Sequence, residues 1–192
     1  MPRIKKVFQA LRFAVEDVYQ KLDDGSEHHR QIVRHPGAVV ILPLVDDDHI
    51  CMIYTYRVAI DRWILELPAG TLETGEPPIE TASRELIEET GYRAASVRHA
   101  HSFNMSPGIL DERMHFYVAS GLRAGDPSRE VGEQIANRIY SWSEVDQLLR
   151  DGKIEDAKTL VALLWYLRYS SLTFSQTSGP MAPATDNARR SS

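Results

Sequence analysis

The sequence predicts a mixed α/β domain preceded by a small antiparallel β-sheet. Two continuous apolar runs, at residues 38–42 and 50–54, are typical of buried strands. Residues 78–90 and 156–169 instead carry apolar side chains at helical spacing. A chain of 192 residues, 43% of them hydrophobic, can bury one substantial core, which argues against two independent catalytic domains.

The N-terminal region, residues 1–36, is predicted to form the small antiparallel sheet. Its stretches alternate partly between apolar and polar residues, and a turn at residues 23–25 interrupts them. The predicted strands lie within residues 7–13, 13–19 and 28–34. A Pro-Gly pair at residues 36–37 marks the boundary, and residues 37–170 are expected to form the main domain.

The main domain is expected to contain several strands and three helices. The two apolar runs, joined by an acidic turn at residues 46–48, predict a β-hairpin buried on both faces. Further strands are predicted at residues 97–103, 115–119 and 135–142. Ser141 or Ser143 can cap a short helix, and the last helix is expected to pack against the body or a partner subunit. Residues 171–192 are rich in Ser, Thr, Pro, Gly and Asn, which predicts a disordered tail.

Composition argues against several kinds of partner. The net charge of -5 and the absence of a basic cluster argue against binding to nucleic acid. The single cysteine, Cys51, cannot form an internal disulfide, and its apolar neighbours indicate a buried spectator rather than a nucleophile. No apolar run has the length of a signal-peptide core or a membrane span. These features predict a cytoplasmic protein with no membrane partner.

The most informative segment is an acidic motif between Gly70 and Tyr92. Glu76 follows Gly70 after five residues, and residues 84–92 read Arg-Glu-Leu-Ile-Glu-Glu-Thr-Gly-Tyr. Side chains three and four residues apart on a helix are neighbours, so the glutamates converge on one surface. These glutamates are Glu85, Glu88 and Glu89. Clustered carboxylates predict a site for a hard divalent cation, Mg²⁺ or Mn²⁺, whereas a solvated acidic helix would leave Gly70 and Glu76 unexplained.

Local rules delimit the helix that carries this motif. The proline pair at residues 77–78 favours a first helical turn and Gly91 favours a helix end, which predicts a helix over residues 78–90. Its apolar stripe comprises Ile79, Ala82 and Leu86. Arg84 lies beside the carboxylates and is predicted to orient Glu88, four residues on.

The motif is Gly, five residues, Glu, seven residues, then Arg-Glu-apolar-x-Glu-Glu-x-Gly-apolar, and at every defined position it resembles the signature of the Nudix hydrolases. The resemblance implies an α/β/α sandwich with a mixed sheet that cleaves nucleoside diphosphates linked to another moiety. It also implies that Glu85 and Glu89 bind metal, with Glu88 and the Ala69 carbonyl as additional ligands. Two or three Mg²⁺ ions per site are expected, and catalytic roles are expected for Glu88 and Arg84.

Segments outside the motif resemble the ADP-ribose pyrophosphatase branch of that family. Residues 106–108 read Ser-Pro-Gly, and together with the following Glu112 they are similar to the marker of this branch. Similar segments lie at residues 35–39, 56–57 and 152–159. The substrate contacts that the resemblance implies are Arg57, Glu66, Ser106, Gly108 and Glu112.

The expected reaction is therefore hydrolysis of ADP-ribose, or of a related ADP-sugar, to AMP and ribose 5-phosphate or another sugar phosphate. A general base is expected from the acidic stretch before the strand at residues 135–142, where Glu133 is favoured over Glu130. By resemblance the protein is expected to be a homodimer whose N-terminal strands complete the partner's site. A broader nucleoside diphosphate sugar or GDP-mannose hydrolase is an alternative that shares every metal ligand. A non-catalytic nucleotide sensor is another, and the retained glutamates argue against it.

Overall fold

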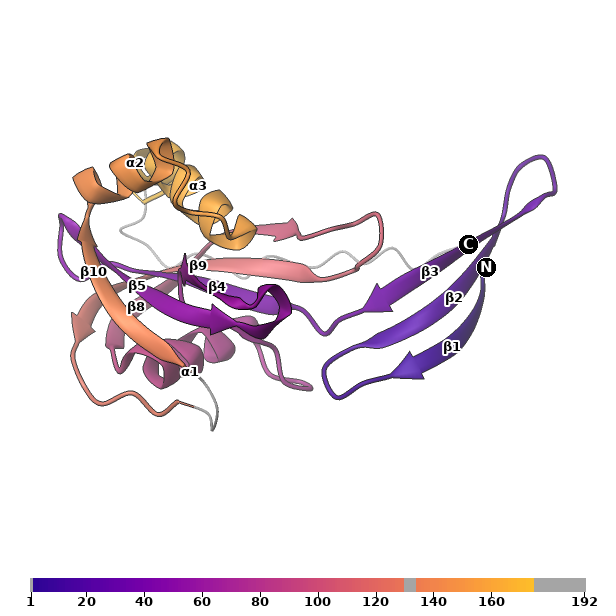
Figure 1. Cartoon of the computed structure of the whole chain (residues 1–192), viewed down its shortest axis with the longest axis horizontal. Helices are drawn as coiled ribbons and strands as arrows, with labels where there is room; N and C mark the ends of the chain where they lie inside the picture. Colours follow the sequence, from indigo (N-terminus) through magenta and orange to yellow (C-terminus); the bar gives the residue numbers. More distant parts are fainter. Residues whose placement is uncertain (1, 130–133, 175–192) are drawn as a thin grey trace.

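The computed structural model describes residues 2–129 and 134–174. Strands β1 (Arg3–Gln9), β2 (Ala14–Lys21) and β3 (Glu27–Arg34) form an antiparallel sheet in sequence order. The predicted N-terminal sheet is thus confirmed, although its first strand begins at Arg3 rather than at residue 7. This sheet projects from the main body, with the β1–β2 turn near the body and the β2–β3 turn far from it (Figure 1).

The main body contains a mixed sheet and an antiparallel sheet. The mixed sheet has the order β7-β4-β9-β8, and only its β4–β9 pair is parallel. Its strands are β4 (Ala38–Pro43), β7 (Ala69–Thr71), β8 (Arg93–Asn104) and β9 (Arg113–Arg123). The antiparallel sheet has the order β10-β5-β6, and a short 3₁₀ helix joins β5 to β6. These elements are β5 (His49–Arg57), η1 (Val58–Ile60), β6 (Arg62–Glu66) and β10 (Ile135–Ser141).

The predicted hairpin between the two apolar runs is wrong. Leu44, which directly follows β4, forms one antiparallel bridge with Ile50 of β5, but β4 and β5 belong to different sheets. Strand β4 pairs with β9, which is distant in sequence, and all its residues are buried. A continuous apolar run marks a strand buried on both faces but carries no information on which strand lies beside it.

Two apolar clusters cover the opposite faces of the mixed sheet, as the period of two along each strand requires. One cluster, which includes Val40 and Phe116, packs against β5 and helices α2 (Trp142–Arg150) and α3 (Ala157–Phe174). The other, which includes Val39 and Tyr117, packs against helix α1 (Pro78–Thr90). Figure 1 shows α1 on one side of the strands and α2 and α3 on the other. The predicted mixed α/β class is confirmed.

Helix α1 has the predicted bounds. Gly91 ends the helix with a φ of 80°, and its N–H donates to the Ile87 carbonyl at 2.8 Å. Ala82 and Leu86 are buried as predicted, but Ile79 is 46% exposed, so its place in the apolar stripe was predicted wrongly.

The start of α2 and the end of α3 can be compared with the predicted cap and the predicted start of the tail. Ser141 caps α2, because the Glu144 N–H donates to its Oγ at 3.3 Å and its own N–H donates to Glu144 Oε2 at 2.8 Å. Helix α3 continues to Phe174, so residues 171–174 are helical and the tail was predicted to begin too early. The remaining tail lies outside the described residues. Within the described ranges, no helix combines the length and the apolar content needed to cross a membrane.

Candidate active site

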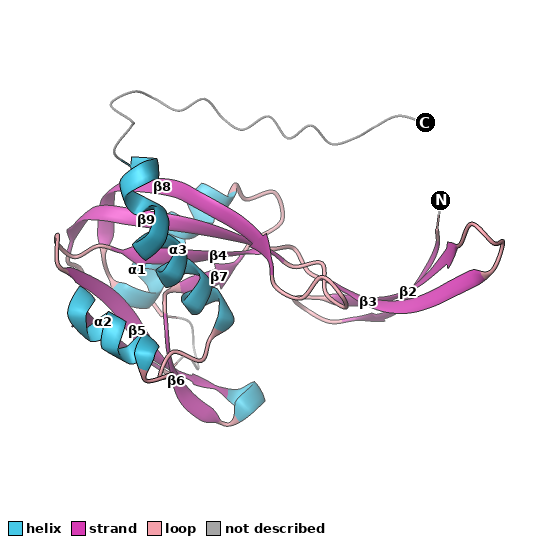
Figure 2. Cartoon of the chain, turned by 90° about the horizontal axis from the view of Figure 1, so that it is seen from above, coloured by secondary structure: helices cyan, strands magenta, loops and turns pink. Residues whose placement is uncertain are grey.

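A pocket of about 670 Å³ opens between α1, the N-terminal end of α3 and the turn that joins β1 to β2. Figure 2 shows β4, β7 and α3 converging on this part of the main body, next to the N-terminal sheet. Acidic and basic side chains both line the pocket. Those that carry the argument are Arg57, Glu85, Glu89, Glu112, Asp156 and Lys158.

The acidic wall is formed by one face of α1. Glu85 and Glu89, one helical turn apart, both line the pocket. Glu89 is 5% exposed, and its Oε2 accepts a hydrogen bond from the Ala69 N–H at 2.9 Å. Gly70 approaches Glu85 so closely that a Cβ atom built on the glycine would lie 1.9 Å from the carboxyl carbon Cδ. The motif therefore needs a glycine at this position to leave room for the Glu85 carboxylate.

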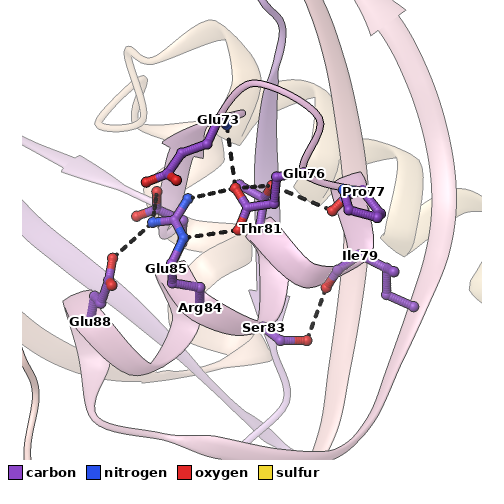
Figure 3. A network of polar contacts seen from close by, with 9 residues as sticks. All are labelled: Glu73, Glu76, Pro77, Ile79, Thr81, Ser83, Arg84, Glu85 and Glu88. Carbon is purple, nitrogen blue, oxygen red and sulfur yellow. Dashed lines mark hydrogen bonds and ion pairs between the residues drawn. The ribbon is translucent and has the colours of Figure 1, made fainter.

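Arg84 links the helix to the loop before it (Figure 3). Its Nε and Nη2 atoms donate to the two carboxylate oxygens of Glu76 at 3.1 and 3.0 Å. Its Nη1 atom donates to Glu85 at 2.8 Å and to Glu88 at 2.9 Å. The predicted contact with Glu88 is present, but the bidentate partner is Glu76, which local helix spacing could not identify because it precedes the helix. The hydrogen bonds from Arg84 lower the pKa of Glu76 from 4.5 to about 2.

The basic wall is formed by β5 and the start of α3. Arg57 donates through Nε and Nη2 to both oxygens of Glu66, each at 2.6 Å. Lys158 also donates to Glu66 and lies 3.0 Å from Asp156. Glu66 is 1% exposed and does not line the pocket, whereas Arg57 and Lys158 do. Burial raises the pKa of Glu66, but the hydrogen bond from Arg57 and the charge of Lys158 outweigh it and hold this pKa below its ordinary value.

The Ser-Pro-Gly turn lies beside the pocket. Glu112 lines the pocket, with its Oε1 atom 3.6 Å from His35 Nδ1. Ser106 and Gly108 are exposed, and neither lines the pocket. The turn therefore brings Glu112 to the site while its own tip faces solvent.

The chain is similar to known proteins in sequence and in fold. A family model described as the NUDIX domain matches residues 33–164. The chain belongs to the Nudix family. Its helix α1 with the preceding loop is therefore the Nudix motif, and residues Gly70 to Tyr92 carry it.

Several relatives extend the match beyond the motif. The ADP-ribose pyrophosphatase of Bacillus subtilis (strain 168) is 40% identical over 151 residues, which cover 78% of this chain and 80% of the relative. The methanol dehydrogenase activator of Bacillus methanolicus is 38% identical over 157 residues, which cover 81% of this chain and 84% of the relative. A crystal structure of an ADP compounds hydrolase matches with a TM-score of 0.77 and 25% identity, covering 88% of this chain and 93% of that one.

The donor set of the Nudix helix fits a divalent cation. Glu85 and Glu89 present carboxylate oxygens to the pocket, and such oxygens are the ligands that hard divalent ions prefer. Across residues 2–129 and 134–174, no three acidic, histidine or cysteine side chains converge as a preformed ion-binding group. Arg84 donates to both Glu85 and Glu88 through Nη1. An ion would therefore compete with Arg84 for these carboxylates.

Not every predicted site residue can be placed. Glu133, predicted as the general base, and its alternative Glu130 lie outside the described residues. In the other direction, sequence reasoning assigned no role to Lys158 or Asp156, which line the basic wall. Their segment, residues 152–159, resembled the ADP-ribose pyrophosphatase branch, but nothing local indicated that α3 starts beside Arg57.

Proposed function

We propose that this Nudix protein is a Mg²⁺-dependent hydrolase of ADP-ribose, or of a related ADP-sugar, that releases AMP and ribose 5-phosphate or another sugar phosphate. The observation that carries the proposal is a pocket lined both by carboxylates of α1 and by the Arg57 guanidinium and the Lys158 ammonium. The diphosphate of an ADP-sugar carries two negative charges, so bound cations are needed for it to enter a pocket that contains carboxylates. The identity to the Bacillus subtilis ADP-ribose pyrophosphatase supports the choice of nucleotide.

The basic wall is proposed to bind the substrate. Arg57 presents a planar guanidinium that suits two-point contact with a phosphate group. Glu66 lies behind the pocket, so it is proposed to hold Arg57 rather than to touch the substrate directly. Glu112 is proposed to accept hydrogen bonds from ribose hydroxyls, with Ser106 and Gly108 shaping the turn that carries it.

The acidic wall is proposed to hold the metal. Glu85 and Glu89 would be the principal ligands, with Glu88 and the Ala69 carbonyl beside them, and two or three Mg²⁺ ions would neutralise the pyrophosphate and polarise its phosphorus. Arg84 is proposed to orient Glu85 and Glu88, because its Nη1 atom contacts both. Glu133, with Glu130 as the alternative, remains the proposed base that takes a proton from the attacking water.

A homodimer in the cytoplasm is proposed as the working form. The N-terminal sheet exposes apolar side chains that a second copy can cover. They include Ile4, Val7, Phe8, Leu11 and Phe13. The turn that joins β1 to β2 also lines the pocket, through Leu11 and Arg12, so the N-terminal sheet contributes residues to the site.

The proposal is tested by incubating the purified protein with Mg²⁺ and separate nucleotides, and measuring the phosphomonoester released. The panel contains ADP-ribose, ADP-glucose, GDP-mannose, UDP-glucose and diadenosine polyphosphates. Efficient cleavage of ADP-ribose or ADP-glucose is expected, and Glu89→Gln is expected to lower kcat by roughly 10² to 10³ because a charge facing the reacting phosphates is lost.

Glu80→Gln is the matched control, because Glu80 lies on the same helix but is exposed and outside the pocket. It should retain activity. A preference for GDP-mannose or UDP-glucose would replace the proposed substrate with the alternative one. Full Mg²⁺-dependent activity in Glu89→Gln would overturn the proposed metal site.

A further inference from the structure

We propose that Asp111 is a positioning residue that fixes Glu112 at the pocket through hydrogen bonds to the end of the N-terminal sheet and the linker after it. The proposal rests on the function proposed above, in which Glu112 contacts the substrate. Asp111 is not among the residues that line the pocket, so it acts through its neighbours. Three hydrogen bonds of Asp111, to Val33, Arg34 and His35, support this role.

The turn that carries Glu112 is closed by its own backbone. The Ser106 carbonyl accepts hydrogen bonds from the N–H groups of Ile109 and Leu110 at 3.0 and 2.9 Å. The Met105 N–H donates to the Glu112 carbonyl at 3.2 Å. These bonds fix the shape of the turn, but they do not fix its position relative to the other wall of the pocket.

Backbone hydrogen bonds attach the turn to the end of β3. The Val33 N–H donates to the Ile109 carbonyl at 2.8 Å, and the Asp111 N–H donates to the Val33 carbonyl at 3.1 Å. Val33 and Leu110 accordingly form a parallel bridge. The end of β3 thus pairs with the turn that carries Glu112. Hydrogen bonds, as well as the covalent chain, therefore join the N-terminal sheet to the main body at this point.

The Asp111 carboxylate completes the junction. Its Oδ1 atom accepts from the His35 N–H at 2.8 Å, and its Oδ2 atom accepts from Arg34 Nη1 at 3.0 Å. Arg34 reaches further and donates through Nε to Glu16 on β2 at 2.8 Å. One carboxylate therefore connects the pocket turn, the linker after β3 and, through Arg34, the neighbouring strand.

Two pocket residues depend on this junction. Glu112 follows Asp111 directly, and its carboxylate faces His35, whose backbone Asp111 holds. Pro36, the next residue of the same linker, also lines the pocket. Loosening Asp111 would let this linker and Glu112 move together. The expected consequence is weaker substrate binding with little change in the chemical step.

The test compares Asp111→Ala and Asp111→Asn with the wild-type protein. Alanine removes both contacts, whereas asparagine keeps an oxygen for the His35 N–H and loses the ion pair with Arg34. In Mg²⁺, the KM for ADP-ribose is expected to rise about tenfold in Asp111→Ala, and less in Asp111→Asn, with kcat within about twofold of wild type. Amide hydrogen exchange is expected to accelerate at Val33 and His35 in the same order.

Asp23→Asn is the matched control, because Asp23 is an exposed aspartate on the far turn of the same sheet. It should change neither KM nor exchange at Val33. Unchanged KM in Asp111→Ala, or a fall in kcat at constant KM, would overturn the positioning role. If the wild-type protein does not cleave ADP-ribose, the proposed function fails. The exchange measurement still tests whether Asp111 holds the turn against β3, and unchanged exchange at Val33 and His35 in Asp111→Ala would overturn that role.

Discussion

At the scale of single residues, the geometry of the site depends on the close approach of the Gly70 backbone to the Glu85 carboxylate. Gly70 has an ordinary backbone conformation, but a Cβ atom added to it would overlap the Glu85 side chain. Any side chain at residue 70 would displace the end of the Glu85 side chain. Because these atoms are flexible and line the pocket, the expected effect is mainly on the position of this proposed metal ligand.

We expect Gly70→Ala to reduce activity strongly, because the new methyl group overlaps the end of the Glu85 side chain and displaces its carboxylate, and to destabilise the protein by no more than about 1 kcal/mol, because that side chain can move. Chemical denaturation measures the free energy of unfolding. The double variant Gly70→Ala with Glu85→Ala removes the atoms that clash and should recover most of the stability while remaining inactive. Equal stability loss in the single and double variants would show that the clash is not with Glu85.

At the scale of elements, helix α1 and the loop before it form one unit held by a partly buried ion pair between Arg84 and Glu76. Glu76 accepts from Arg84, from the Thr81 hydroxyl at 2.8 Å and from the Glu73 N–H at 3.3 Å. The loop is therefore fixed against the helix that carries the proposed metal ligands. Arg84 has two roles that follow from one position: it anchors the loop through Glu76, and it gathers Glu85 and Glu88.

The acid sensitivity of this unit follows from the lowered pKa of Glu76. A carboxylate whose pKa falls on folding stabilises the protein above its unfolded value of 4.5, and this contribution is lost as pH falls toward about 2. We expect Glu76→Gln to lower the free energy of unfolding by about 1–2 kcal/mol at neutral pH. Denaturation across the acidic range should show the difference from wild type shrinking between pH 4.5 and about 2.

Glu73→Gln tests the same loop without the ion pair, because Glu73 contributes its backbone N–H to the network. Its effect on stability should be small and independent of pH. A Glu76→Gln effect that stays constant down to about pH 2 would contradict the role of the Arg84 contact.

At the scale of the whole molecule, the N-terminal sheet exposes apolar side chains that no other described part of the chain covers. Every residue of β1 is exposed, and Figure 2 shows the sheet extending away from the main body. A three-stranded sheet needs an apolar face to be covered for stability. Its attachment through Asp111 and Arg34 holds only one end. A second copy of the chain is the proposed cover.

Sedimentation is expected to give a mass of about twice the 21.8 kDa of one chain. Ile4→Glu and Phe8→Glu place a charge among the exposed apolar side chains of β1, so each should shift the equilibrium toward monomer. Lys5→Gln, on the same strand, should leave the mass unchanged. A wild-type protein that is monomeric at every concentration would contradict the proposed dimer.

The sequence by itself determined the motif and most of the elements, because these depend on neighbours along the chain, but it did not delimit strands β6 and β7. Helix α1 was predicted to the residue, since a proline pair begins it and Gly91 ends it. Spacing alone predicted that Glu85, Glu88 and Glu89 share one surface; Glu85 and Glu89 line the pocket, whereas Glu88 does not. Continuous apolar runs likewise identified β4 and β5 as buried strands.

Only the tertiary structure decided which distant segments meet. In the structure, β4 pairs with β9 and not with β5. Arg84 makes its bidentate contact with Glu76, and Lys158 lies beside Arg57 and Glu66. The tertiary structure also joins Asp111 to the end of β3. Each of these contacts depends on how whole elements pack against a shared core. A local sequence pattern does not specify which distant segment will lie beside it.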